Sequence, residues 1–174
     1  MYMLKNYIYF NKNVYCFGGY GEKNVAFPIS MRFDLDKNLW FNIAPMPKAD
    51  AICHSAIFNE NILISGHVNK NILLYSVDLD SFSIIPYDFS ECKTKIIINA
   101  DRLYLIEDRK GHIYESEVGN EYAWNKIANS IIEYTDQMYA SYNKGEIYII
   151  ISSTMRAWMF LFIFNKGFSN IKKL

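Results

Sequence analysis

The stretch between residues 14 and 47 decides the fold. It opens with VYCFGGYG (residues 14–21), where a short apolar run predicts a β-strand that stops at two adjacent glycines, Gly18 and Gly19. From residue 31 it reads MRFDLDKNLWFNIAPMP, in which a second predicted strand reaches Asp34, turns, and is followed by Trp40. Short aromatic strands joined by polar turns predict an antiparallel sheet.

The same pattern returns 48 residues later. FNKNVYCFGGY (residues 10–20) aligns with FNENILISGHV (residues 58–68), so that Gly66 falls on Gly18. The strand that follows again runs into Asp-Leu-Asp, which aligns Asp78 with Asp34. The sequence therefore contains at least two copies of one structural unit.

Two weaker units complete the chain. The third predicts strands over residues 94–99, 102–106 and 112–117, and the fourth over residues 138–142, 146–150 and 157–164. A tyrosine recurs at one strand position in three units, and a large apolar residue anchors all four. The tyrosines are Tyr15, Tyr104 and Tyr148, and the anchors are Trp40, Ile84, Trp124 and Phe168.

An apolar strand, a double glycine, a strand ending in Asp and a following Trp together resemble the kelch repeat, a unit of roughly 50 residues. The resemblance implies an all-β, kelch-type β-propeller of about four blades, each with four antiparallel strands, as one domain over residues 1–174. The repeats would span approximately residues 4–50, 51–91, 92–134 and 135–174. Kelch rings usually have more blades. Four blades would therefore close as a small ring, remain a partial or truncated ring, or be completed by missing blades or a second copy.

The residues that repeat are interpreted as structural. Glycine permits positive φ and close backbone approach, and GGYG lacks the following helix that a phosphate-binding loop needs. The repeated Asp is expected to accept hydrogen bonds that close the next turn, and the Trp to pack between adjacent blades. The full set is Gly18, Gly19, Asp34, Trp40, Gly66, Asp78, Ile84, Trp124 and Phe168.

Composition argues against several classes of protein. Lys+Arg and Asp+Glu both number 18, and no segment is strongly basic, so nucleic-acid binding is not expected. Residues 147–164 have the length of a membrane span but contain a central Arg156, so a β-hairpin is predicted there and no membrane association. The three cysteines, Cys16, Cys53 and Cys92, are expected to be buried and reduced. Without a secretion signal, a cytoplasmic location is predicted.

No catalytic, cofactor-binding or metal-binding residue is predicted. The histidines His54, His67 and His112 have no companion at metal-ligand spacing, and no nucleophile motif occurs. The kelch resemblance implies a non-catalytic protein–protein interaction module, an intracellular scaffold. Some kelch propellers are enzymes, and a small carbohydrate-active or redox enzyme is the alternative. An enzyme is expected to bring titratable groups together, for example His67 with Asp108 or Arg109.

Partner binding is predicted on the loops that follow the second and fourth strands of each unit, because these vary in length whereas the hairpin turns do not. A protein partner is expected to contact them. The residues singled out are Tyr20, Lys23, His67, Lys70, Arg109 and Arg156.

Overall fold

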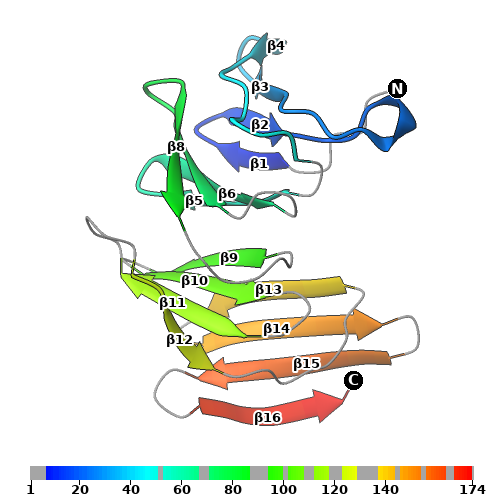
Figure 1. Cartoon of the computed structure of the whole chain (residues 1–174), viewed down its shortest axis with the longest axis vertical. Helices are drawn as coiled ribbons and strands as arrows, with labels where there is room; N and C mark the ends of the chain where they lie inside the picture. The colour runs from blue at the N-terminus through cyan, green and yellow to red at the C-terminus, as the bar shows by residue number, and fades with distance from the viewer. Residues whose placement is uncertain are drawn as a thin grey trace. The chain divides into compact units, whose positions relative to one another are not determined.

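The structure is a computed structural model that describes residues 7–50, 53–66, 71–86, 94–99, 102–107, 112–117, 123–128, 137–143, 146–153, 156–163 and 167–173. In these ranges the chain is all-β and contains no α-helix. It forms four antiparallel sheets of four strands each, and in every sheet neighbouring strands follow one another along the chain (Figure 1). The chain divides into two compact units, residues 1–91 and 92–174.

Unit 1 contains two of the sheets. Sheet 1 consists of β1 (Tyr7–Phe10), β2 (Asn13–Phe17), β3 (Ser30–Asp34) and β4 (Leu39–Asn42). Sheet 2 consists of β5 (Cys53–Phe58), β6 (Asn61–Gly66), β7 (Asn71–Ser76) and β8 (Ser81–Pro86).

Unit 2 contains the other two. Sheet 3 consists of β9 (Thr94–Asn99), β10 (Arg102–Glu107), β11 (Ile113–Glu117) and β12 (Asn125–Ala128). Sheet 4 consists of β13 (Gln137–Asn143), β14 (Glu146–Ser153), β15 (Arg156–Ile163) and β16 (Gly167–Lys173). The predicted hairpin at residues 147–164 is confirmed, because β14 and β15 pair along their length. No helix long and apolar enough to cross a membrane occurs in the part of the chain that the structure describes.

The first hairpins of sheets 1 and 2 are identical in register, which confirms the alignment of Phe10 with Phe58. Phe10 pairs with Asn13, and Phe58 with Asn61. Both two-residue turns have positive φ throughout, a conformation that asparagine tolerates and that suits the twist of a hairpin. In each, the side-chain amide of the second Asn donates to a turn carbonyl, at 2.7 Å in sheet 1 and 2.9 Å in sheet 2.

The second hairpins correct the predicted alignment. In sheet 1 Asp34 pairs with Leu39, and in sheet 2 Ser76 pairs with Ser81. Ser76, and not Asp78, therefore occupies the place of Asp34. The left-handed residues that close the two turns agree with this register, since Asn38 has φ 56° and Asp80 has φ 46°.

The same shift of two residues moves the anchor of sheet 2. Trp40 pairs with Phe33, and the equivalent pair is Phe82 with Tyr75, so Ile84 was the wrong anchor. The sequence alignment followed the Asp-Leu-Asp motif, whereas the left-handed turn residue and the strand pairing fix the register. In sheet 4 the predicted anchor holds, because Phe168 pairs with Phe162.

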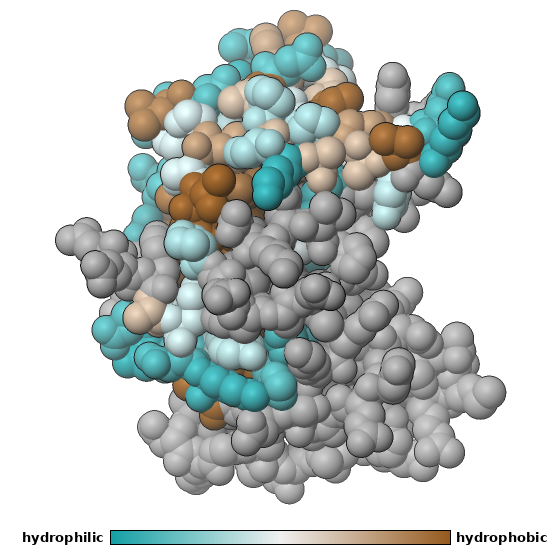
Figure 2. Space-filling view, in the orientation of Figure 1, coloured by the Kyte–Doolittle hydropathy of each residue, from teal (hydrophilic) through white to brown (hydrophobic). Residues whose placement is uncertain are grey.

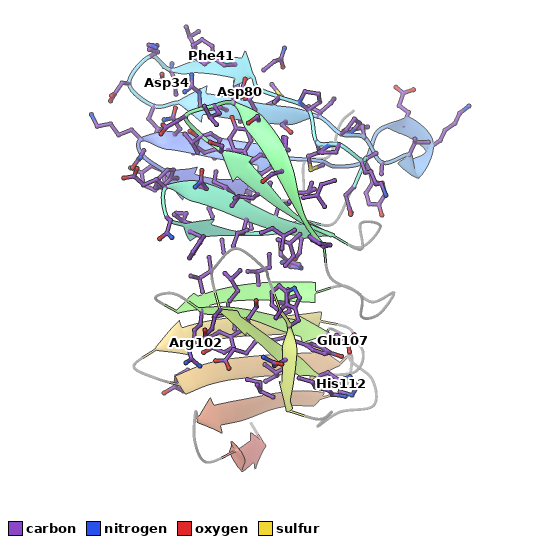
Figure 3. The ribbon with its side chains drawn as sticks, turned by 60° about the vertical axis from the view of Figure 1, so that its left-hand side comes forward. Asp34, Phe41, Asp80, Arg102, Glu107 and His112 are labelled. Atoms are coloured by element: carbon purple, nitrogen blue, oxygen red, sulfur yellow. The ribbon has the colours of Figure 1, made fainter. Side chains whose placement is uncertain are left out.

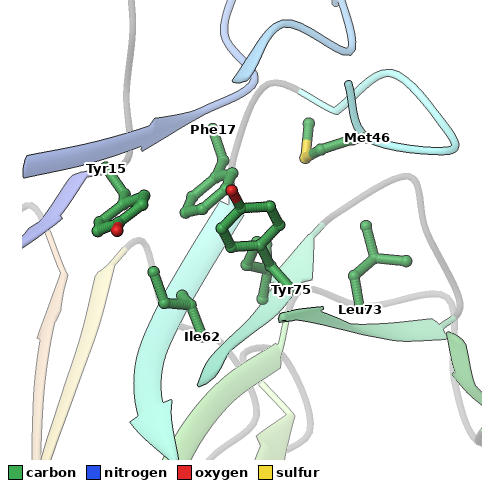
Figure 4. Packing of buried hydrophobic residues seen from close by; sticks show 7 residues of the cluster. Tyr15, Phe17, Met46, Ile62, Leu73 and Tyr75 are labelled. Carbon is green, nitrogen blue, oxygen red and sulfur yellow. The ribbon is translucent and has the colours of Figure 1, made fainter. Parts of the chain in front are cut away.

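The core of unit 1 lies between its two sheets. Tyr15 and Phe17 of sheet 1 pack on Ile62, Ile64, Leu73 and Tyr75 of sheet 2, with Met46 at one side (Figure 4). The ring of Tyr75 lies 6.0 Å from that of Tyr15 and 5.6 Å from that of Phe17. Each such fully buried side chain contributes roughly 1.5–3 kcal/mol through removal from water. This packing joins the two sheets of unit 1 through one hydrophobic core.

Within unit 1, Trp40 does not lie between the two sheets. Its side chain is 49% exposed, and its ring lies 5.1 Å from that of Phe33 in the same hairpin. Phe82, the equivalent residue of sheet 2, does lie between sheets, 6.1 Å from the ring of Phe17. Phe82 therefore has the packing between sheets that was predicted for this repeat position, although the sequence analysis had placed Ile84 there.

Candidate functional site

Gly18 and Gly66 are held against one residue, Asp50, whose side chain is fully buried. Gly18 has φ 64°, and a Cβ there would overlap the carbonyl oxygen of Asp50. A Cβ on Gly66 would overlap the carboxylate of the same residue. The N–H of Gly19, at φ 137°, donates to the Asp50 carbonyl at 2.9 Å. Of the predicted structural features, positive φ is confirmed for Gly18 and Gly19, and close approach for Gly18 and Gly66.

These contacts support the loop between β2 and β3 at its base. The N–H of Gly18 donates to the carbonyl of Ile29 at 2.8 Å, which joins the two ends of the loop. Within it, Tyr20 forms an isolated β-bridge with Ala26, and the N–H of Gly21 donates to the Val25 carbonyl at 2.9 Å. The loop between β2 and β3 therefore has its own hydrogen-bonded structure.

The tip of this loop is a short 3-10 turn, η1 (Glu22–Asn24), in which Lys23 has φ 62°. Sequence reasoning did not predict this turn. It projects from sheet 1 at the right of Figure 1, and in Figure 2 its surface is mostly hydrophilic (teal). Lys23 is exposed, and beside it Val25 exposes 62% of its surface. The tip thus exposes an acidic residue, Glu22, a basic residue, Lys23, and an apolar one, Val25.

Of the six loop residues predicted to contact a partner, two have described side chains, Tyr20 and Lys23, and both lie in this loop. Arg156 is the first residue of β15, where only the backbone is described. His67, Lys70 and Arg109 lie outside the described residues, and so does Asp108.

A second group of polar residues lies at the end of β10 in sheet 3. Glu107 stands in the place that Gly18 occupies in sheet 1, and its N–H donates to the carbonyl of His112 at 3.0 Å. Its carboxylate is buried and lies 2.9 Å from Nδ1 of His112, whose side chain is 21% exposed. The hydroxyl of Tyr114 is 3.5 Å from the same nitrogen. We call these three residues the Glu107 cluster; Figure 3 shows Glu107 beside His112.

The chemistry of the Glu107 cluster follows from its burial. The 2.9 Å separation between the Glu107 carboxylate and Nδ1 of His112 is that of an ion pair. A buried carboxylate is costly unless it is paired. Burial raises the pKa of the Tyr114 phenol, and the charge of Glu107 and a hydrogen bond to its carboxylate raise it further. The cluster therefore brings a buried carboxylate and a phenol to the same imidazole nitrogen.

A pocket of about 200 Å³ also lies in sheet 3, but none of the Glu107 cluster lines it. Its lining residues are Glu115, Glu117, Ala123 and Asn125. Oε1 of Glu115 accepts hydrogen bonds from Arg102, at 2.7 Å, and from the Tyr104 hydroxyl, at 2.8 Å. No group of three metal-ligating side chains occurs among the described residues.

Tyr104 and Glu115 have a counterpart in sheet 1 with the charge reversed. Tyr104 pairs with Glu115 at the register position where Tyr15 pairs with Arg32. Burial raises the pKa of both phenols, and a neighbouring Arg lowers it in part. Sequence reasoning found the recurrent tyrosines but not the charged residues opposite them, because these belong to the next strand.

In the turn between β7 and β8, Asp80 is the residue whose side chain accepts hydrogen bonds from outside the turn. The sequence analysis had selected Asp78 instead. Oδ1 of Asp80 accepts hydrogen bonds from the hydroxyl of Tyr75, at 2.7 Å, and from the backbone N–H of Ala44, at 2.8 Å. It thereby joins sheet 2 to the segment that follows sheet 1. The signal available in the sequence was the seven-residue spacing shared by Phe33 with Trp40 and by Tyr75 with Phe82.

Comparison with known proteins shows the fold alone. No protein-family model matches the sequence, and no curated protein matches it. Solved structures do match. One of them, "Structure of YjhT", is 12% identical with a TM-score of 0.74, over 97% of this chain and 69% of that one.

Proposed function

We propose that this chain is a kelch-type β-propeller module of about four blades that binds a protein partner without catalysis, in the cytoplasm. The architecture is supported by four successive four-stranded antiparallel sheets and by the two sheets of unit 1 that pack face to face. Successive sheets packed in this way are the elements of a propeller. The likeness to a solved structure over nearly the whole chain supports the same reading.

The observation that carries the binding function is the loop between β2 and β3. Gly18 and Gly19 fix its base against Asp50, and the loop holds itself in one conformation through the bonds of Gly21 and Tyr20. A pre-organised loop on a rigid sheet loses little conformational entropy on binding. Its exposed Lys23 and Val25 suit a partner that offers a carboxylate beside an apolar side chain.

The test is affinity purification of the full chain followed by quantitative mass spectrometry. A Lys23→Glu/Val25→Asp variant is expected to lose a protein that the wild type retains. The control is Lys12→Glu in the turn at the opposite end of β2, because the equivalent residue of sheet 2 is Glu60 with the same positive φ. If wild type and loop variant retain the same proteins, the loop is not the binding site.

The Glu107 cluster favours a second function, an enzyme that acts on a carbohydrate. A buried carboxylate paired with an imidazole is the arrangement that general acid–base chemistry uses. A thermal-shift screen of mono- and oligosaccharides is expected to find a ligand whose effect Glu107→Gln abolishes and Glu117→Gln, at an exposed carboxylate of the same sheet, leaves intact. If no sugar raises the melting temperature of the wild type, this function is rejected.

A further inference from the structure

The pocket in sheet 3 is separate from the Glu107 cluster. It lies near the start of β10, because register pairs Arg102, the first residue of that strand, with the lining residue Glu117. Glu107 is the last residue of the same strand, and Figure 3 shows it well apart from Arg102. The pocket and the Glu107 cluster therefore lie at opposite ends of β10.

The repeat explains why sheet 3 has a pocket at this place. In sheet 1, Phe41 pairs with Arg32, and its ring lies 5.2 Å from the guanidinium group. In sheet 3 the equivalent pair is Asn125 with Glu115, and the amide is much shorter than a phenyl ring. The residue two positions earlier changes in the same sense, from a leucine in sheet 1 to Ala123 in sheet 3. The space that sheet 1 fills with its own side chains is therefore open in sheet 3, with a volume of about 200 Å³.

The charge beside this space is reversed as well. Sheet 1 has the cation Arg32, and sheet 3 has the carboxylate of Glu115, whose side chain is 20% exposed. Glu117 adds a second carboxylate, 80% exposed. The guanidinium group of Arg102 lies 2.7 Å from Glu115 and 3.6 Å from Glu117. Two carboxylates thus share one cation, which leaves one negative charge in excess.

The lining residues offer mainly hydrogen-bond acceptors. The two hydrogen bonds to Glu115 both end on Oε1, so they fix this side chain and leave Oε2 for another donor. The carboxylate of Glu117 and the amide oxygen of Asn125 are further acceptors. None of the described lining residues is a cation, and Lys126, beside Asn125 in β12, lies on the opposite face because side chains alternate along a strand. The pocket therefore suits a ligand group that is cationic and donates hydrogen bonds.

We propose that the pocket in sheet 3 binds a primary alkylammonium group, carried by a small amine or by a lysine side chain of a protein partner. An ammonium group has three donors and no acceptor, and its charge balances the excess carboxylate. The methylene groups next to it are suited to contact Ala123. Pockets for drug-sized ligands usually have about 300–1,000 Å³, so the smaller volume here suits one short chain. Only the lysine form rests on the proposed partner-binding function.

Saturation-transfer NMR of the full chain tests this, with n-butylamine as the probe and 1-butanol as its uncharged counterpart. The wild type is expected to bind the amine and not the alcohol. Asn125→Phe introduces the ring that sheet 1 carries and keeps both carboxylates, and it is expected to weaken binding at least about tenfold by filling the pocket. Glu115→Gln keeps the shape of the side chain and removes its charge, for an expected weakening of about fivefold. Glu60→Gln, at an exposed carboxylate of sheet 2, is expected to leave binding unchanged.

A second probe, Nα-acetyl-lysine methylamide, distinguishes the two sources of the ammonium group. Tighter binding of this probe than of n-butylamine would assign the pocket to a lysine side chain of a partner. Equal or weaker binding would assign it to a small amine.

The proposal is overturned if the wild type binds neither amine, if 1-butanol binds as well as n-butylamine, or if Asn125→Phe binds as the wild type does. Thermal melts show whether each variant is folded, and Ala123→Leu, which fills the pocket from a different position, replaces Asn125→Phe if that variant is unfolded. The purification experiment with the Lys23→Glu/Val25→Asp variant is read separately. Failure of the partner-binding function and failure of this pocket are therefore distinguishable.

Discussion

Trp40 and Phe82 occupy the same position in successive sheets, opposite Phe33 and Tyr75 respectively, yet one ring is half exposed and the other lies between sheets. Because their surroundings differ, truncating the two side chains is expected to change the free energy of unfolding by different amounts. Phe82→Ala is expected to lower the free energy of unfolding by about 2 kcal/mol, less than the loss of a fully buried ring, because Phe82 is partly buried against the core. Trp40→Ala is expected to cost about 1 kcal/mol, because surface truncations cost little. Urea unfolding measures both, and equal losses would contradict the assignment of Phe82 to the core.

Asp50 limits what can replace the two glycines it contacts. Gly66→Ala and Gly18→Ala are each expected to destabilise the protein by more than about 2 kcal/mol, through overlap with buried atoms. The overlap differs: a Cβ at Gly66 meets the Asp50 carboxylate, whereas one at Gly18 meets the backbone carbonyl. In an Asp50→Ala background the cost of Gly66→Ala should fall by more than about 1 kcal/mol, the scale of coupling between contacting residues. The cost of Gly18→Ala should not fall, and rescue of both would refute this geometry.

Asp80 is expected to matter more than its neighbour Asp78. Asp80→Ala removes the acceptor of the Tyr75 hydroxyl and of the Ala44 N–H, for an expected loss of about 1–3 kcal/mol. Asp78→Ala changes an exposed carboxylate that accepts no hydrogen bond among the described residues. Its expected effect on unfolding is within about 0.5 kcal/mol. If thermal melts rank the two variants the other way, the register of the β7–β8 hairpin is wrong.

Asp34 makes stability depend on pH in the acid range. The N–H of Lys37 donates to its Oδ1 at 3.0 Å and that of Asp36 at 3.1 Å, which confirms its predicted turn role. The bond from Lys37, with the smaller contributions of its ammonium group and of Asp36, holds the pKa of Asp34 below its ordinary value.

The sign of the effect follows from that direction. Folding favours the ionised form of Asp34. Its contribution to the free energy of unfolding is therefore complete above the pKa of the unfolded state and disappears as pH falls through the pKa of the folded state. Between about pH 5 and 2, the melting temperature of Asp34→Asn is expected to fall less than that of the wild type. Asp78→Asn is the control, and the same slope in wild type and Asp34→Asn would contradict the prediction.

Four buried phenols make stability depend on pH in the alkaline range. Burial is the largest cause that raises the pKa of Tyr15, Tyr75, Tyr104 and Tyr114. A raised folded pKa gives stability that is complete below the unfolded value and is lost as pH rises above about 10. Absorbance titration near 295 nm, where tyrosinate absorbs, should show tyrosines that ionise only well above pH 10, and Tyr104→Phe should remove one of them. Uniform ionisation of all tyrosines near pH 10 would contradict this.

Local patterns in the sequence predicted the strands well. The Phe-Asn-x-Asn pattern at residues 10–13 determines a two-residue turn by its own backbone preferences, so the first two hairpins were predicted in register. The break at residues 152–156 likewise predicted the β14–β15 hairpin. In both cases the deciding interactions lie within a few residues of one another.

Contacts between strands and sheets could not be predicted in the same way. Asp78 was preferred to Asp80 because the sequence alignment followed the Asp-Leu-Asp motif, whereas the hydrogen bonds of Asp80 with Tyr75 and Ala44 form only in the folded chain. The exposure of Trp40 depends on whether another sheet covers it, and the spacing of residues in the sequence does not predict this. The pairing of Glu107 with His112 requires the register of β10 and β11 as well as the replacement of a glycine.

The contact of Asp50 with both Gly18 and Gly66 has a consequence for evolution. The backbone carbonyl of Asp50 contacts the glycines at the end of β2, and its side chain contacts Gly66 at the end of β6. An insertion or deletion between β4 and Asp50 would displace it from both glycines at once, so this connection cannot change length freely. The loop between β2 and β3 is joined at its base by Gly18 and Ile29 and can lengthen or shorten beyond that bond. Among related sequences, insertions and deletions are therefore expected at residues 20–28 and are expected to be rare at residues 43–50.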